Sequence, residues 1–151
     1  MKQVRIIKQY FPQRNNQGYG RKSMRVLGGH EQEHIDPMLG LFYVDLKLPA
    51  GFPDHPHRGF ETVTYVLEGS IYHEDFTGAK DVIGPGDCQW MTAGKGIMHA
   101  EMPGSDTNWT KCFQLWINLS MDKKMMDPMY QDCKSHEIQE YNRVDGSYRQ
   151  L

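Results

Sequence analysis

The sequence predicts an all-β fold, either a sandwich or a barrel. Between residues 35 and 120, short segments rich in β-branched and aromatic residues are separated by turn residues about every 8–12 positions. Nothing in this region keeps the apolar spacing of an amphipathic helix for two turns. No internal repeat or low-complexity segment interrupts it. These observations favour one domain built from short strands.

Turn residues bound each expected strand. The segment MLGLFYVDLKL at 38–48 is a candidate buried strand, and Pro49-Ala50-Gly51 ends it. Thr77-Gly78 and Pro85-Gly86-Asp87 mark two further turns. The last strand alternates Phe113, Leu115, Ile117 and Leu119 with Gln114, Trp116 and Asn118. The predicted strands span residues 38–48, 60–69, 70–76, 79–84 and 111–120, and CQWMTAG forms another after the second turn.

The two ends of the chain are expected to differ from this centre. Residues 1–11 contain enough apolar residues for a short strand or an ordered arm. The polar, glycine-bearing segment 12–24 is expected to be a loop. After Ser120, the segment MDKKMMDPMYQDCKSHEI is expected to form one short helix, which Ser120 caps and Pro128 interrupts.

Composition and charge exclude several classes of ligand. The chain has 151 residues, of which 38% are hydrophobic and 24% charged, and this is enough for one domain with a hydrophobic core. Its 17 Lys and Arg residues against 19 Asp and Glu give a net charge of −2. Neither a nucleic acid nor an acidic membrane is therefore expected as a direct ligand.

Cysteine usage and the lack of targeting signals predict an intracellular protein. Three cysteines without CxxC spacing argue against a disulfide framework and against a thiolate zinc site. Residues 1–11 lack the apolar run of a signal peptide. No stretch approaches the roughly 20 apolar residues of a membrane span.

Two pairs of residues form the chemical centre of the sequence, HPH at 55–57 and HAE at 99–101. Residues i and i+2 of a strand point to the same face, roughly 6–7 Å apart along the chain. His55 and His57 can therefore aim two imidazoles into one space, and His99 with Glu101 can add an imidazole and a carboxylate. Two such strands side by side supply four ligands to one metal ion and leave open positions on an octahedral ion.

The donor atoms of these residues indicate which metals fit. Nitrogen and oxygen ligands without a thiolate favour Fe(II), Mn, Co, Ni or Cu over a structural zinc ion. Three neutral imidazoles and one carboxylate leave a divalent ion with a net charge of about +1, suited to an anionic oxygen ligand or O₂. The other histidines lack such partners and are expected to be surface or hydrogen-bonded residues: His30, His34, His73 and His136.

Glu61 is a further acidic candidate with three alternative roles. It lies four residues beyond His57, so in an unbroken strand it shares the face of the ligands. It would then be an additional ligand, an acceptor for an imidazole N–H or an acid in the pocket, and the role of acceptor is favoured. A bulge at Gly59 would reverse the parity and turn Glu61 away.

Three blocks of the sequence resemble the N-terminal domain of the pirin family. They are GFPDHPHRGFETVTYVLEG at 51–69, PGDCQWMTAGKGIMHAEMP at 85–103 and QLWINL at 114–119, and Asp36-Pro37 and Asp127-Pro128-Met129-Tyr130 extend the resemblance over about residues 25–135. Pirins belong to the cupin superfamily, so the resemblance implies a single cupin, jelly-roll-like β-barrel with metal-binding pairs on facing strands. The turn Gly94-Lys95-Gly96, where glycine permits positive φ, leads the second pair into the pocket.

The resemblance also implies a metal and two alternative functions. The pirin ligands correspond to His55, His57, His99 and Glu101, the same four that spacing selects, and the usual metal is Fe(II) or Fe(III). Some pirins resemble quercetin 2,3-dioxygenases, which open a flavonol ring with O₂ and release carbon monoxide. Glu101, the only acidic ligand, is then the candidate catalytic base. Animal pirins are regarded as nuclear, iron-dependent coregulators, and a transcription-factor protein would be the partner in that case.

Family members usually contain two cupin domains in a chain of double length. The resemblance therefore divides this chain into an N-terminal arm and loop at 1–24, a pirin-type cupin barrel at 25–120, and a short helix with a C-terminal segment at 121–151. The last part would lead to a second cupin domain that this sequence does not contain. The expected location is the cytoplasm or the nucleus.

Overall fold

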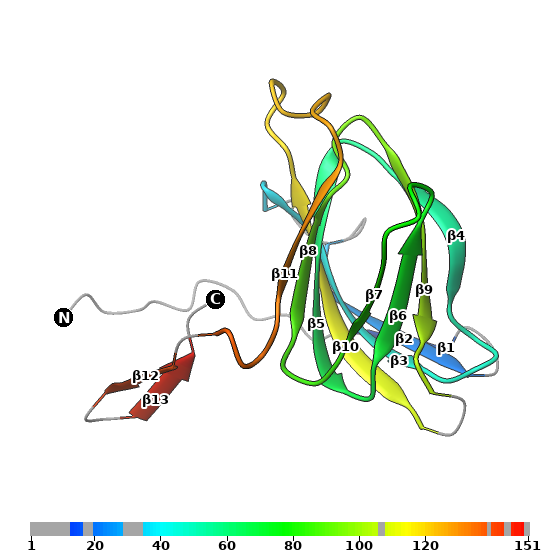
Figure 1. Cartoon of the computed structure of the whole chain (residues 1–151), viewed down its shortest axis with the longest axis vertical. Coiled ribbons are helices and arrows are strands. Elements are labelled where there is room, and N and C mark those ends of the chain that lie inside the picture. The colour runs from blue at the N-terminus through cyan, green and yellow to red at the C-terminus, as the bar shows by residue number, and fades with distance from the viewer. Residues whose placement is uncertain are drawn as a thin grey trace.

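The computed structural model describes residues 13–16, 20–28, 35–105, 108–138, 140–143 and 146–149. Two β-sheets pack face to face (Figure 1). The larger sheet has the strand order β1 (Gln13–Asn16), β2 (Arg21–Leu27), β3 (Met38–Leu46), β10 (Thr110–Asn118), β5 (Phe60–Glu68), β8 (Cys88–Thr92), β11 (Met129–Cys133). The smaller sheet has the order β4 (Phe52–His57), β9 (Ile97–Pro103), β6 (Ile71–Asp75), β7 (Lys80–Ile83). A separate hairpin pairs β12 (Glu140–Arg143) with β13 (Gly146–Arg149).

The all-β class predicted from the sequence is confirmed. Strands β3, β5, β6, β7 and β10 occupy the five predicted segments, and β8 follows the predicted turn at 85–87. Gly78 and Gly86, at φ of 89° and 83°, provide the positive φ that these turns require. Local alternation and turn chemistry therefore locate the central strands correctly.

The closed barrel is wrong, because the two sheets form a sandwich. Within the described part of the chain, no strand of one sheet pairs with a strand of the other. After Cys133 the chain turns, with the Glu137 N–H donating to the Lys134 carbonyl at 2.9 Å, instead of continuing alongside β7. Backbone pairing between the sheets is therefore replaced there by side-chain contacts.

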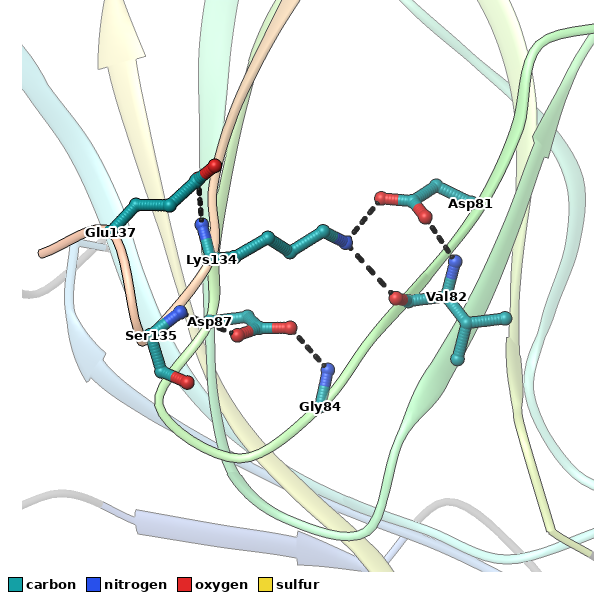
Figure 2. Close-up of polar contacts among 7 residues, drawn as sticks. All are labelled: Asp81, Val82, Gly84, Asp87, Lys134, Ser135 and Glu137. Atoms are coloured by element: carbon teal, nitrogen blue, oxygen red, sulfur yellow. Dashed lines mark hydrogen bonds and ion pairs between the residues drawn. The ribbon is translucent and has the colours of Figure 1, made fainter.

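Lys134 makes the contacts that join the two sheets at this edge (Figure 2). Its Nζ donates to Asp81 Oδ2 at 2.6 Å and to the Val82 carbonyl at 3.1 Å, both on β7. The next N–H, of Ser135, donates to Asp87 Oδ1 at 2.7 Å. The two Lys134 bonds hold the end of β11 against the smaller sheet without backbone pairing, and the Ser135 bond fixes it to the turn between β7 and β8.

The predicted helix after Ser120 is also wrong. Two successive turns replace it, in which Lys123 N donates to the Ser120 carbonyl at 2.9 Å and Met126 N to the Lys123 carbonyl at 3.1 Å. Lys124 ties this loop to the neighbouring turn by donating to the Gly59 carbonyl at 2.8 Å, a contact that local helix preference does not include. None of the residues described forms a helix long and apolar enough to cross a membrane.

Part of the segment predicted as a loop, 12–24, is β-strand. β1 pairs with β2, and β2 pairs with β3, both antiparallel. A polar sequence gives no apolar strand pattern here, and backbone pairing places these strands, β2 against β3 and β1 against β2. The arm predicted at residues 1–11 lies outside the described residues.

The interior between the sheets has an apolar end and a polar end. The apolar end is a cluster of buried side chains from both sheets: Val44, Leu46, Val66, Ile71, Ile83 and Cys112. Along each strand, alternate residues face this interior, as in β9, which buries Ile97, His99, Glu101 and Pro103. The inward face of β9 therefore carries two of the predicted metal ligands directly into the sandwich.

Candidate metal centre

Antiparallel pairing of β4 and β9 brings the two predicted ligand pairs together. His55 lies opposite His99 in the register, and the two Nε2 atoms are 3.0 Å apart. His57 joins them, so that one ring nitrogen from each of the three histidines lies within 4.8 Å of the others. The turn at Gly94 and Gly96, with φ of 51° and 140°, leads β9 into this position as predicted. Three imidazole nitrogens therefore converge on one point.

The His57 and His99 imidazoles are buried and held neutral. Their exposed fractions are 7% and 1%. Burial lowers the pKa of His57 to about 4, and the nearby His55 adds to this effect. Burial, together with His55, His57 and His73, lowers the pKa of His99 to about 2. A neutral imidazole has the free lone pair that a metal ligand needs.

Two of the rings have one nitrogen available for a metal. The Nδ1–H of His55 donates to the Pro53 carbonyl at 2.9 Å, which leaves the lone pair on Nε2 directed toward His99. The Nε2 atom of His57 is buried and is the single side-chain N or O atom among the described buried residues without a hydrogen-bond partner. Such an atom costs about 1–3 kcal/mol of stability, and a bond to a metal ion would satisfy it. The residues present therefore fit a metal ion.

Glu101 is buried beside the histidines but is held by other groups. It lies outside the three-histidine cluster. Gln114 Nε2 lies 3.2 and 3.0 Å from its two carboxylate oxygens, and the Thr64 hydroxyl lies 3.4 Å from Oε1. Burial raises its pKa, although the hydrogen bonds from Gln114 and Thr64 and the charge of His55 oppose that shift. Glu101 is therefore a buried carboxylate with an increased proton affinity next to the imidazoles.

His73, expected only to be a surface or hydrogen-bonded residue, is part of the polar end. Its Nε2 atom lies 3.0 Å from His99 Nδ1 and 3.0 Å from the Tyr130 hydroxyl. Burial lowers the pKa of His73. The signal in the sequence is strand parity, because His73 lies two residues after the buried Ile71 and two before the buried Asp75. Tyr130 gave no such signal, since it lies within the segment 121–138, for which the sequence predicts a helix and no strand.

Glu61 is turned away from the histidines. The strand is broken at Gly59, with φ of 75°, and Glu61 accepts a hydrogen bond from the Thr92 hydroxyl at 2.6 Å. It lines a cavity of about 440 Å³ with the exposed Trp90 and Met129. The favoured role of Glu61 as an acceptor for an imidazole N–H is therefore replaced by a contact on the other face of the sheet.

Aromatic side chains of the larger sheet lie against the histidine cluster. His57 contacts Phe60 and Trp116 edge-on, with ring centroids 5.1 and 5.7 Å apart. Phe42 extends this group, with its ring centroid 4.9 Å from that of Trp116. The Trp116 indole N–H donates to Gln114 Oε1 at 3.0 Å, so the aromatic group is connected to the amide that holds Glu101. One side of the site is therefore lined by aromatic rings.

One protein-family model covers most of the sandwich. The Pirin family model matches residues 20–117. The chain belongs to the pirin family. A pirin of Rattus norvegicus is 52% identical over 124 residues, which cover 82% of this chain and 42% of the rat protein. This chain therefore spans less than half the length of that relative.

Solved structures of other proteins share the pirin fold described here. A quercetin 2,3-dioxygenase from Acinetobacter baumannii matches with a TM-score of 0.75 and 31% identity, over 86% of this chain and 49% of that one. A bacterial pirin from Escherichia coli in complex with nickel(II) matches with a TM-score of 0.71 and 27% identity, over 82% of this chain and 54% of that one. The all-β fold therefore has counterparts in a bacterial pirin and in a quercetin 2,3-dioxygenase.

Proposed function

We propose that this pirin domain binds one transition-metal ion, with iron as the expected metal, and cleaves flavonols with O₂ in the manner of a quercetin 2,3-dioxygenase. The observation that carries the proposal is the convergence of His55, His57 and His99, whose ring nitrogens lie within 4.8 Å of one another. The similarity to a quercetin 2,3-dioxygenase and to a nickel-bound pirin supports it.

His55, His57 and His99 would hold the metal through ring nitrogens, and Glu101 is the proposed fourth ligand. Imidazole and carboxylate ligands suit iron, nickel and similar divalent ions. When bound, the metal supplies Lewis acidity toward a flavonol hydroxyl and redox chemistry with O₂.

Glu101 is the proposed base for the flavonol hydroxyl. It is the one carboxylate among the four proposed ligands, so it is the group among them that can take up the hydroxyl proton. Gln114 contacts both of its oxygens and fixes their orientation. The adjacent Phe60 and Trp116 rings offer an apolar surface against which a planar flavonol ring can pack.

The experiment loads the purified protein with Fe(II) without oxygen, adds quercetin and then admits O₂. We expect the flavonol absorption band to shift before O₂ is added and to disappear afterwards, with release of carbon monoxide. Glu101→Gln should lower turnover by about 10²–10⁴-fold, the usual range for a lost general base. Glu61→Gln, which removes a carboxylate from the outer face of the larger sheet, is the matched control and should keep turnover unchanged.

The absence of both the spectral shift and turnover in iron-loaded protein would reject the dioxygenase function. Iron-dependent transcriptional coregulation through protein contact, the alternative that the pirin family suggests, depends on the same metal ligands. Loss of metal therefore does not separate the two functions, whereas flavonol turnover does.

A further inference from the structure

His99 has no backbone or carboxylate partner for its second ring nitrogen among the contacts of the described residues. Its Nε2 atom faces His55 in the metal centre, and its Nδ1 atom lies 3.0 Å from Nε2 of His73. His73 and His99 are only 2% and 1% exposed, so solvent does not compete for this contact. The orientation of the His99 ring is therefore set by another histidine.

We propose that His73 is a positioning residue, which holds His99 in the tautomer that binds the metal. The inference rests on the proposed metal binding and adds a residue to it. A metal ion bound to Nε2 of His99 leaves the ring proton on Nδ1. That N–H donates to Nε2 of His73, so His73 must present a lone pair there and carry its own proton on Nδ1. Ligand histidines in metal sites are commonly fixed by such an acceptor.

Tyr130, itself held by Asp75, lies against the same ring nitrogen of His73. The Tyr130 hydroxyl oxygen lies 3.0 Å from His73 Nε2, and its O–H is hydrogen-bonded to the Asp75 carboxylate. Asp75 is fixed in turn, because its Oδ1 accepts the Thr77 N–H at 2.8 Å and the Ala79 N–H at 3.1 Å. When no metal is bound, a chain of hydrogen bonds therefore connects a turn of the smaller sheet to the histidine cluster.

A different set of tautomers satisfies these contacts, and that of Tyr130 as well, when no metal is bound. His73 Nε2–H then donates to His99 Nδ1 and toward the Tyr130 oxygen, and His99 Nε2–H donates to Nε2 of His55. Metal binding moves one proton from Nε2 to Nδ1 on each of His99 and His73. All three rings stay neutral, so the net charge of the network does not change.

The test uses Zn(II) as a diamagnetic probe with ¹⁵N-histidine-labelled protein. Long-range ¹H–¹⁵N spectra distinguish the two tautomers of each ring. We expect His99 and His73 to carry their protons on Nε2 without zinc and on Nδ1 with zinc. A zinc-bound spectrum with the His73 proton still on Nε2 would overturn the proposal.

Two variants separate positioning from a merely structural role. His73→Leu removes the acceptor and should weaken Zn(II) and Ni(II) binding by about 10–100-fold, the range for lost partners of metal-bound histidines. His73→Gln places a carbonyl oxygen near the position of Nε2 and should restore affinity to within a few-fold. Equal affinities for the two variants would contradict the proposal, whatever their thermal stability. If His73→Leu does not fold, the wild-type spectra and His73→Gln still decide.

Failure of this inference is distinguishable from failure of the metal site. Wild-type protein that binds neither Zn(II) nor Ni(II) would reject the metal centre itself. Wild-type binding that His73→Leu leaves unchanged would reject the positioning role alone.

Discussion

The two ends of the sandwich interior are equally shielded from solvent, but one is lined by apolar side chains and the other by polar ones. At the apolar end Val66 and Ile83 are 0% exposed, and at the polar end His99 and His73 are 1% and 2% exposed. The same strands build both ends, since β6 contributes Ile71 to one and His73 to the other. Burial is therefore set by strand parity, whereas the use made of a buried position depends on the residue type.

This difference means that the apolar end contributes most of the stability, whereas the polar end carries the candidate metal ligands. Burying a Leu or Ile side chain contributes about 1.5–3 kcal/mol. A buried polar group contributes little net stability and is costly without a partner. At the polar end Gln114, Thr64, His73 and Tyr130 act as those partners, and His57 Nε2 alone lacks one within the described residues. Three predictions test this separation.

Leu46→Ala should have the largest effect on stability. Leu46 is 1% exposed and lies within the apolar cluster, so truncation leaves a cavity and should lower the free energy of unfolding by about 2–5 kcal/mol. Urea denaturation measures this loss. Leu67→Ala, at a residue that is 37% exposed, is the control and should change stability by less than about 0.5 kcal/mol. The number of metal ions bound per folded molecule should not change. A lower number would show that metal binding at the polar end depends on packing at the apolar end.

His57→Leu should have the opposite consequence at the polar end. Leucine fills the space against Phe60 and Trp116 and removes the unpartnered Nε2 atom, so the metal-free protein should be as stable or about 1 kcal/mol more stable. Metal binding, measured by calorimetry, should be lost. His136→Leu, at an exposed histidine, should leave metal binding intact. A large destabilisation by His57→Leu would show that His57 serves the fold and not a ligand.

Asp87→Asn should have the smallest effect, because it changes a contact outside both ends (Figure 2). Burial alone would raise the pKa of Asp87, but the N–H groups of Gly84 and Ser135 and the charge of Lys134 lower it below 3.8. A lowered pKa stabilises the fold above pH 3.8, and this contribution disappears as the pH falls through the folded-state value. The free energy of unfolding of the variant should therefore be lower than that of wild type by about 1 kcal/mol near pH 7. The difference should disappear at low pH, where Asp87 of the wild type is protonated and as neutral as the asparagine. A pH series of urea midpoints measures it, and a constant difference at every pH would contradict it.

Much of the fold could be predicted from the sequence, because local patterns determine it. Proline and glycine turns and β-branched runs place β3, β5 and β10 correctly. The segment after Ser120 could not be predicted in this way, since Lys124 and Met126 form contacts with Gly59 and Lys95 that are distant in sequence. Local sequence patterns also do not determine whether the two sheets close into a barrel, because this depends on where β11 ends.

The part of the site that depends on the alternation of side chains along single strands could be predicted from the sequence. Spacing alone groups His55 with His57, and pairing of β4 with β9 adds His99. The last predicted strand was correct, yet its Gln114 and Trp116 face the site, contacting Glu101 and His57. Which face of an alternating strand turns inward depends on the opposite sheet, and a local pattern does not contain that information.

A metal ion bound to the unpartnered nitrogen of His57 would connect metal supply to the stability of the folded protein. A ligand that binds only the folded state adds about 2.7 kcal/mol of stability when its free concentration is 100 times its dissociation constant. A metal at this site would therefore act on the folding equilibrium as well as on chemistry. Metal-starved cells would hold a larger unfolded fraction, open to proteolysis, so the abundance of the protein would follow the availability of its metal.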